Sequence, residues 1–167
     1  MVINKAQRVG VFIDVQNMYY SAKSMYQGKV NFAQVLKEAV SGRSLIRAIT
    51  YVIKTDVVKE EKNFFEALDK IGFEVKAKDL QVFYGGAKKG DWDIGIAMDM
   101  IELAPKLDTA VLVSGDGDFV PLVQHLQRAM GVRVEVIAFG KSAASKLKEA
   151  ADSFIDLDKE LRKYLMK

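Results

Sequence analysis

The sequence predicts an α/β fold in three layers, with helices on both faces of a central, mostly parallel sheet of about five to six strands. Short β-branched runs alternate with amphipathic stretches of about 10–14 residues, and parallel strands require helical crossovers of this kind. Runs such as VGVFI and TAVLV are apolar on both sides of the strand, which is typical of a sheet covered on both faces.

The strands and helices follow from these patterns in chain order. The strands are expected at 9–15, 45–53, 73–78, 109–114 and 132–138. The clearest helices are expected at 32–40, 58–71, 93–103 and 120–130, with later ones at 143–151 and 159–166. Two prolines and 12 scattered glycines provide no linker, so we expect 1–167 to be a single domain. The helix at 159–166 is amphipathic and is expected to pack either on the domain or on a partner. In the second case the partner is a second copy of the chain, so the pattern predicts a homodimer.

Composition excludes several classes of protein. The chain has no cysteine, which excludes thiol catalysis, thiolate zinc sites and disulfide scaffolds. We expect neither a signal peptide nor a membrane span, and we therefore expect a cytoplasmic protein. The net charge of +3 points only weakly to a polyanionic partner.

Acidic residues follow two of the expected strands. Asp14 lies in FIDVQN at the end of 9–15, and Asp116 and Asp118 lie in SGDGDF after 109–114. Ligands of open α/β sheets bind outside the carboxyl ends of strands, where the strand order reverses. Each acid also has a structural interpretation: a helix cap or ion pair for Asp14, a turn for Asp116 and an N-cap for Asp118.

Asp93 lies in the apolar stripe of the helix expected at 93–103. At 100° per residue Met100 falls on the same side of the helix, whereas Asp99 and Glu102 fall on or beside the polar side. The helix dipole stabilises a first-turn carboxylate by only about 0.3–1 kcal/mol. A bound cation is therefore the stronger explanation of an inward Asp93, and a solvated or ion-paired role is expected for Asp99.

Carboxylates without histidine or cysteine form a site of oxygen ligands, which suits Mg²⁺ or Mn²⁺ better than Zn²⁺. Such ions activate water for in-line attack on a phosphodiester and stabilise the leaving oxygen. Asn17 and Ser114 are expected beside the ligands, where they orient water or a carboxylate. For Asn17, a role as a helix cap is an equal alternative.

These motifs, in this order, resemble the NYN domain group of PIN-like nucleases, and most closely its LabA-like branch. The resemblance is carried by FIDVQN at 12–17, KGDWDIGIAMD at 89–99, SGDGDF at 114–119 and SKLKEAADSFIDL at 145–157. It implies a PIN-like, Rossmann-like three-layer fold and a ribonuclease that uses Mg²⁺ or Mn²⁺ and leaves a 5′-phosphate. Trp92 departs from the family pattern, which has a smaller aliphatic residue there. The metal and catalytic residues implied by the resemblance are Asp14, Asp93, Asp116 and Asp118, with Asn17 and Ser114 beside them.

Basic and aromatic residues lie close together in the sequence near the expected site. Single-stranded nucleic acid binds to such surfaces through phosphates on lysines and bases on ring faces. Substrate binding is accordingly predicted for Lys89 and Trp92, although packing suits Trp92 better than contact with a base. Lys141 and Ser142 follow the strand at 132–138, where backbone N–H groups can receive a phosphate.

Three functions fit this sequence. The first is a metal-dependent ribonuclease acting on single-stranded or loop RNA. The second is an RNA-binding or regulatory protein that keeps the fold and has weak or no catalytic activity, since no general acid is evident. The third is a phosphohydrolase acting on small nucleotides with the same ions.

Overall fold

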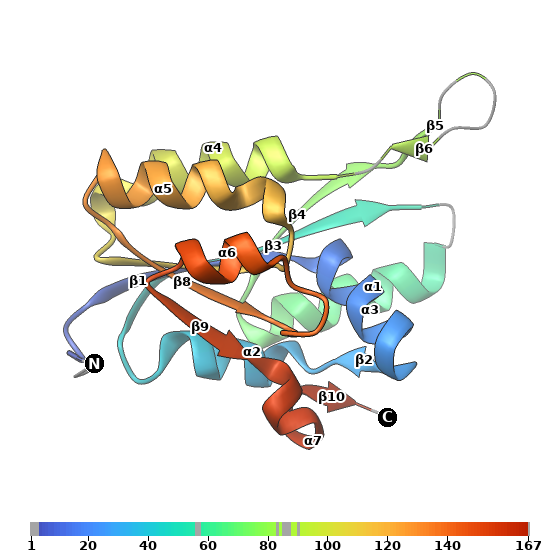
Figure 1. Ribbon diagram of the computed structural model, residues 1–167. Coiled ribbons are helices and arrows are strands. Elements are labelled where there is room, and N and C mark those ends of the chain that lie inside the picture. Colours follow the sequence, from blue (N-terminus) through green and yellow to red (C-terminus); the bar gives the residue numbers. More distant parts are fainter. Residues whose placement is uncertain (1–3, 56–57, 83, 85–87, 90, 167) are drawn as a thin grey trace.

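The computed structural model describes residues 4–55, 58–82, 84, 88–89 and 91–166, and only the backbone of residues 58, 59, 81, 82, 88 and 89. Six parallel strands form the central sheet in the order β4-β3-β1-β7-β8-β9 (Figure 1). They are β1 (Arg8–Asp14), β3 (Ser44–Lys54), β4 (Glu74–Asp79), β7 (Thr109–Val113), β8 (Arg133–Ala138) and β9 (Ser153–Asp156).

Helices cover both faces of this sheet, which confirms the three-layer α/β architecture (Figure 1). One face packs against α1 (Val15–Tyr26), α2 (Phe32–Val40), α3 (Val58–Ile71) and α7 (Leu161–Tyr164). The other face packs against α4 (Asp93–Leu103), α5 (Val120–Arg128) and α6 (Ser145–Ala150). Three short 3-10 helices complete the helical elements of the described residues: η1 (Ala104–Lys106), η2 (Gly117–Phe119) and η3 (Leu157–Glu160).

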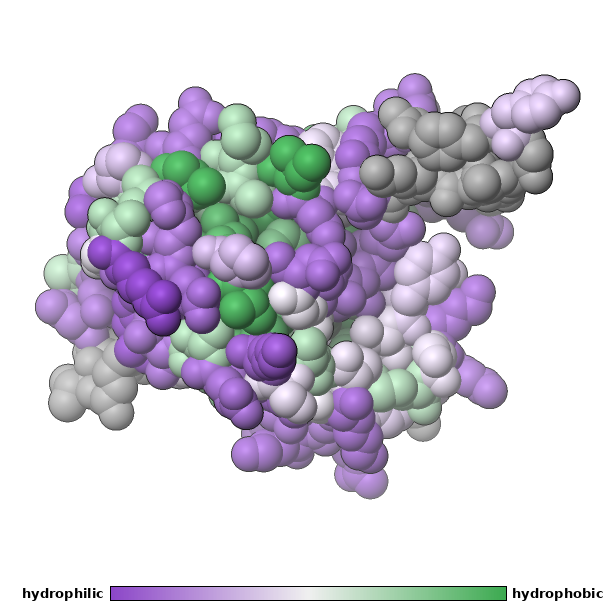
Figure 2. Space-filling model, turned by 45° about the horizontal axis from the view of Figure 1, so that its top comes forward, coloured by the Kyte–Doolittle hydropathy of each residue, from purple (hydrophilic) through white to green (hydrophobic). Residues whose placement is uncertain are grey.

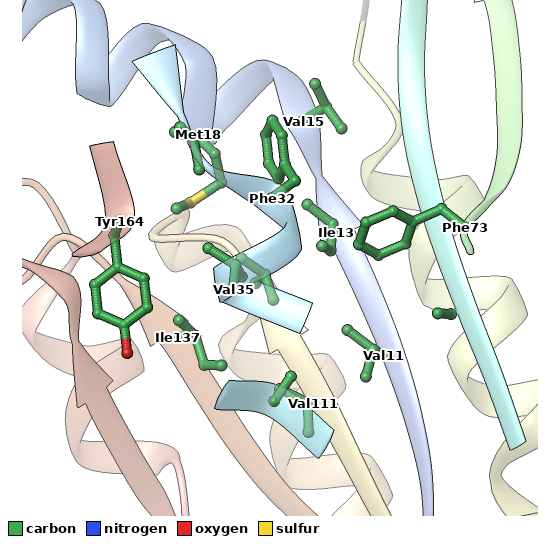
Figure 3. Close-up of a cluster of buried hydrophobic side chains, with 14 of the residues drawn as sticks. Val11, Ile13, Val15, Met18, Phe32, Val35, Phe73, Val111, Ile137 and Tyr164 are labelled. Atoms are coloured by element: carbon green, nitrogen blue, oxygen red, sulfur yellow. The ribbon is translucent and has the colours of Figure 1, made fainter. Parts of the chain in front are cut away.

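Strand β1 supplies side chains to both hydrophobic cores, because successive residues of a strand point to opposite faces. Val11 and Ile13 join the cluster under α2, which Figure 3 shows together with Val35 and Tyr164. Phe12 points to the opposite cluster, under α4 and α5. Complete burial of such a side chain contributes about 1.5–3 kcal/mol. The double-sided burial holds the end of β1 in a fixed position.

The strand order reverses between β1 and β7. From β1 the chain adds β3 and β4 on one side, and from β7 it adds β8 and β9 on the other. In the register between the two central strands Ile13 pairs with Val113, so residues 14 and 114 leave the sheet side by side. Open α/β sheets bind their ligands at such a reversal.

The structure differs from the predicted elements at several points. Helix α1 and strand β9 were not among the expected elements. Helix α6 begins at Ser145 rather than at 143, because residues 141–144 form a turn after β8. The helix expected at 159–166 is wrong in extent: α7 ends at Tyr164, and β10 (Leu165–Met166) pairs with β2 (Lys29–Val30). A second short pair joins β5 (Gln81–Val82) to β6 (Lys88–Lys89).

The apolar side of the C-terminal segment packs on its own chain. Tyr164 is buried, and Leu161 and Leu165 pack against the core under α2. The amphipathic pattern that predicted a homodimer is thereby used within the chain, and self-association remains a prediction. Exposed apolar side chains lie elsewhere, among them Ile94 and Met98 on α4. Figure 2 shows a group of apolar residues on one face of the molecule. No helix in the described part of the chain is long and apolar enough to cross a membrane.

Candidate functional site

Asp14 ends β1 and caps helix α1. Its side chain is only 7% exposed. One carboxylate oxygen accepts the backbone N–H of Asn17 at 3.3 Å, and the other accepts the hydroxyl of Ser114 at 3.1 Å. Burial raises the pKa of Asp14, the two hydrogen bonds lower it, and the nearby charges of Asp116 and Asp91 raise it again. The predicted cap is present, but it leaves this buried carboxylate facing other acids.

The loop after β7 brings Asp116 to the same place. Buried Ser114 accepts the backbone N–H of Asp116 at 3.2 Å, while Gly115 donates its N–H to the amide oxygen of Asn17 at 2.9 Å. Asn17 therefore ties α1 to the β7 loop. Asp116 caps η2 by accepting the N–H of Asp118 at 2.9 Å, so its turn role and its position in the site coexist.

The two glycines around Asp116 are required by a neighbouring segment of the chain. A Cβ at Gly115 would lie 3.0 Å from Cα of Ala143, and a Cβ at Gly117 would lie 2.9 Å from Cβ of Ala144. Ala144 also donates its N–H to the carbonyl of Gly115 at 3.0 Å. Close approach of the segment before α6 thus fixes the loop that presents Asp116.

Asp93 is the first residue of α4 and is half-buried. Its pKa is raised to about 7, mainly by burial and then by the nearby charges of Asp116, Asp14 and Asp91, in that order. A hydrogen bond with the side chain of Asp116 acts in the same direction. The inward position predicted from the helical periodicity is therefore present, and the group lies among like charges.

The acids form a cluster centred on Asp93 and Asp116. One carboxylate oxygen from each of Asp93, Asp116 and the exposed Asp118 lies within 4.8 Å of the other two. Asp93 and Asp116 also line a cavity of about 440 Å³, together with Asp14 and Asp91. Asp118 is not part of the cavity lining and lies at the outer side of the cluster.

Asp91 was missed by the sequence reasoning. It is exposed, accepts the N–H of Asp93 at 3.4 Å and lines the cavity. The residue precedes α4, so no helical periodicity could place it. Its spacing of two from Asp93 in GDWD was the signal available, because a residue just before a helix can cap the first turn.

Asp99 lies outside the cluster, as its polar position on the helix predicted. Lys76 pairs with its carboxylate at 2.7 Å, and the hydroxyl of Tyr51 donates to the same oxygen at 2.7 Å. Lys76 neutralises the charge of Asp99, and Tyr51 adds an uncharged hydrogen-bond donor. Two acids of one helix thus have different surroundings, one paired and one not.

The predicted substrate-binding residues are dispersed. Ser142 lines the cavity, but Lys141 is exposed and is absent from the lining. The ring of Trp92 packs over Gly95 and near Tyr51, donates its N–H to the carbonyl of Val52 at 2.8 Å, and lies outside the lining. The side chain of Lys89 is outside the described part of the chain.

Helix α1 forms one wall of the cavity and was not predicted. Its lining residues recur at helical spacing, so they share one side of the helix. The core residues Val15, Met18 and Ala22 occupy the other side. The lining residues of this wall are Gln16, Asn17, Tyr20, Ser21, Ser24 and Met25.

The donor set of this cluster fits a divalent cation. Among the residues described, no ion pair neutralises Asp14, Asp93 or Asp116. Carboxylates at this separation repel one another, as the raised pKa of Asp93 shows. Oxygen ligands without sulfur or imidazole are the type that Mg²⁺, Mn²⁺ and Ca²⁺ prefer.

Comparisons with known proteins place the whole chain in one group. It is 28% identical to the "Low amplitude and bright protein LabA" of Synechococcus elongatus, over 98% of this chain and 90% of that protein. A crystal structure of a protein of unknown function from Vibrio parahaemolyticus matches with a TM-score of 0.89 and 32% identity, covering 99% of this chain and all of the other. The T5 5′-exonuclease matches with a TM-score of only 0.45 at 17% identity, over 86% of this chain and 56% of that one, which is too distant to transfer any residue. The NYN domain model matches residues 8–158, and the chain therefore belongs to the NYN domain family.

Proposed function

We propose that this protein is a metal-dependent ribonuclease that hydrolyses phosphodiester bonds in unpaired RNA. The observation that carries the proposal is the group of carboxylates at the strand-order reversal, none of which pairs with a cation among the described residues. Membership of the NYN domain family supports nuclease chemistry at this position. RNA as the substrate and the identity of the ion are part of the proposal.

Asp93 and Asp116 are proposed as the central ligands of the ion, with Asp14 on the buried side and Asp118 on the exposed side. A bound Mg²⁺ or Mn²⁺ supplies an activated water and charge stabilisation for the leaving oxygen. Ser114 holds the carboxylate of Asp14, and Asn17 holds the β7 loop, so both residues act by positioning.

The charge of the chain is compatible with a polyanionic substrate. The chain has 25 basic and 22 acidic residues in total. Several of the acids are concentrated in the cluster, and bound cations neutralise them. The remaining surface then carries a clear basic excess, which attracts phosphates over a range of about 8–10 Å at physiological ionic strength.

The test is cleavage of end-labelled RNA in Mn²⁺ or Mg²⁺ by the wild-type protein and by the double variant Asp93→Asn with Asp116→Asn. We expect products with 5′-phosphates from wild type, none in EDTA, and a loss of at least about 100-fold in the double variant, the order of magnitude that a catalytic electrostatic group contributes. Glu102→Gln is the matched control, because it neutralises an exposed acid on the same helix α4.

The other outcomes identify the alternatives. Cleavage that survives EDTA or the double substitution contradicts the proposed site. RNA binding with a steep salt dependence but without product, in fresh metal, contradicts turnover and supports a binding or regulatory role. Activity on nucleotides alone supports a small-molecule phosphohydrolase, and equal cleavage of DNA contradicts RNA specificity.

A further inference from the structure

The wall of the cavity that helix α1 and Ser142 form is uncharged. Helix α1 contributes amides, hydroxyls, a thioether and one aromatic ring to it, and Ser142 adds another hydroxyl. No Lys, Arg or His stands among the lining residues that the structure describes. Ligand contacts on this side therefore consist of hydrogen bonds and ring contacts rather than ion pairs. A part of the ligand that carries no charge is the chemically matched occupant.

Tyr20 is the aromatic residue of this wall. It lines the cavity, yet 58% of its surface is exposed. An amphipathic ring that remains exposed at a cavity rim offers a flat surface to a ligand. Its position is six residues after Asp14, or about 9 Å along the helix axis. This separation is comparable with the reach of one nucleotide from its phosphate to its base.

Tyr19 provides a natural comparison on the same helix. Its ring meets that of Tyr20 edge to face, with centroids 5.4 Å apart and an interplanar angle of 76°. The ammonium of Lys23 lies 5.7 Å from the centroid of Tyr19. Tyr19 is 44% exposed but does not line the cavity. The two neighbours thus differ in the property that matters, which is access to the cavity beside the acids.

A flat, uncharged group tethered to a phosphate is a nucleobase. Bases inside a duplex stack on both faces with their neighbours, so only an unpaired base can present a face to a protein ring. We propose that Tyr20 stacks on the unpaired base of the nucleotide whose phosphate lies at the acidic cluster. This inference rests on the proposed nuclease function, because a cation held by the acids would position the phosphate. It also identifies Tyr20 as a substrate-binding residue that selects unpaired strands.

The test measures binding separately from cleavage. Anisotropy titrations with a labelled single-stranded oligonucleotide compare wild type with Tyr20→Ala, Tyr20→Phe and Tyr19→Ala, in Ca²⁺, a cation that oxygen ligands of this type also bind. Loss of one base–aromatic stack weakens binding about 5- to 100-fold, so this loss is expected for Tyr20→Ala. Tyr20→Phe retains the ring and Tyr19→Ala lies outside the cavity, and both are expected to remain within about threefold of wild type. The same ranking is expected for KM in Mn²⁺, with kcat less affected.

An oligomer of the same length whose sugars carry no bases distinguishes stacking from a structural role. With this ligand the difference between wild type and Tyr20→Ala should shrink to within about twofold, because no base is present to stack. A penalty that persists without bases, or equal penalties for Tyr19→Ala and Tyr20→Ala, overturns the inference. If wild type cleaves RNA and Tyr20→Ala binds and cleaves it equally well, the stacking is rejected and the nuclease proposal stands. Tyr20-dependent binding without any cleavage by wild type rejects the nuclease proposal and keeps the stacking.

Discussion

Two buried carboxylates of the same sheet have opposite surroundings. Glu135, in β8, is 4% exposed, and it is bound by Arg43 at 2.8 and 3.1 Å and by Arg133 at 3.1 Å. Asp14, at the end of β1, is 7% exposed and accepts one hydroxyl and one backbone N–H. Its charged neighbours are acids, with Asp116 the stronger of the two that act on it.

The difference shows how this fold treats a buried negative charge. Burial of an unpaired carboxylate costs several kcal/mol even after relaxation. At Glu135 the chain offsets that cost with its own guanidinium groups. At the end of β1 it adds Asp116 and Asp91 instead, which increases the cost. Such an arrangement is stable against repulsion only when protons or cations from solution are bound, and this is the physical argument for a cation site.

The largest effect on stability is expected at Glu135, the carboxylate that is paired with arginines of its own chain. Glu135→Gln leaves Arg43 buried without its counter-charge, which destabilises the fold by about 3–5 kcal/mol. Thermal unfolding should show a large fall in Tm, since each kcal/mol shifts Tm by about 2–4 °C in a chain of this length. Asp93→Asn, by contrast, should raise the Tm of the metal-free protein. A larger loss of stability in Asp93→Asn than in Glu135→Gln would contradict the comparison.

The next effect is stabilisation by metal at the unpaired carboxylates. A cation that binds only the folded state raises the free energy of unfolding by about 2.7 kcal/mol at 100 times its dissociation constant. Differential scanning in increasing Mn²⁺ should therefore raise Tm in wild type. The variant Asp93→Asn with Asp116→Asn should show little shift, and Glu102→Gln should respond like wild type. An equal shift in all three would indicate binding elsewhere.

The fold was predictable to the extent that apolar periodicity marks its elements. Helices α2, α3 and α4 have the predicted bounds, because each buries a regular apolar stripe. Helix α1 has a weaker contrast between an apolar and a polar side. The side that faces away from the core lines the cavity, and it carries tyrosines and serines where a surface helix carries Lys and Glu. Strand β9 is short and half-buried, so its alternation is weak.

Part of the candidate site was predictable for the same reason. Asp14 and Asp116 follow buried strands, and helical periodicity turns Asp93 inward, so three acids could be named from local pattern. The places of Asp91 and Tyr20 in the cavity lining depend on how α1 and α4 are positioned relative to the two central strands. Local sequence pattern does not determine this tertiary arrangement. Trp92 shows the converse, since its sequence neighbours predict ligand contact while its ring packs on Gly95 and near Tyr51.

A smaller effect on the stability of the metal-free protein is expected from a change of pH. The pKa of Asp93 is raised to about 7 in the folded protein, above the value of about 3.9 for an unfolded Asp. The folded state therefore binds more protons between these values, and the free energy of unfolding of metal-free protein falls as pH rises from about 4 to about 7. Because Asp93 is partly exposed, solvent screens the effect, and we expect only about 2–4 °C lower Tm at pH 8 than at pH 5. Asp93→Asn should flatten this slope, although Asp14 retains a contribution of the same sign.

The smallest effect, on the affinity for Mn²⁺, is expected from substitution of Asp118. Here the comparison between differently placed carboxylates applies within the cluster itself. Its carboxylate belongs to the same group of oxygens as Asp93 and Asp116, but it is exposed, so water already stabilises its charge. A cation therefore gains less from Asp118 than from a carboxylate that is desolvated. We expect Asp118→Asn to weaken Mn²⁺ binding by about 3- to 10-fold, and Asp93→Asn to weaken it more. Titration of Mn²⁺ by water proton relaxation measures both affinities. If Asp118→Asn were the more damaging change, burial would not determine which carboxylate depends most on the cation.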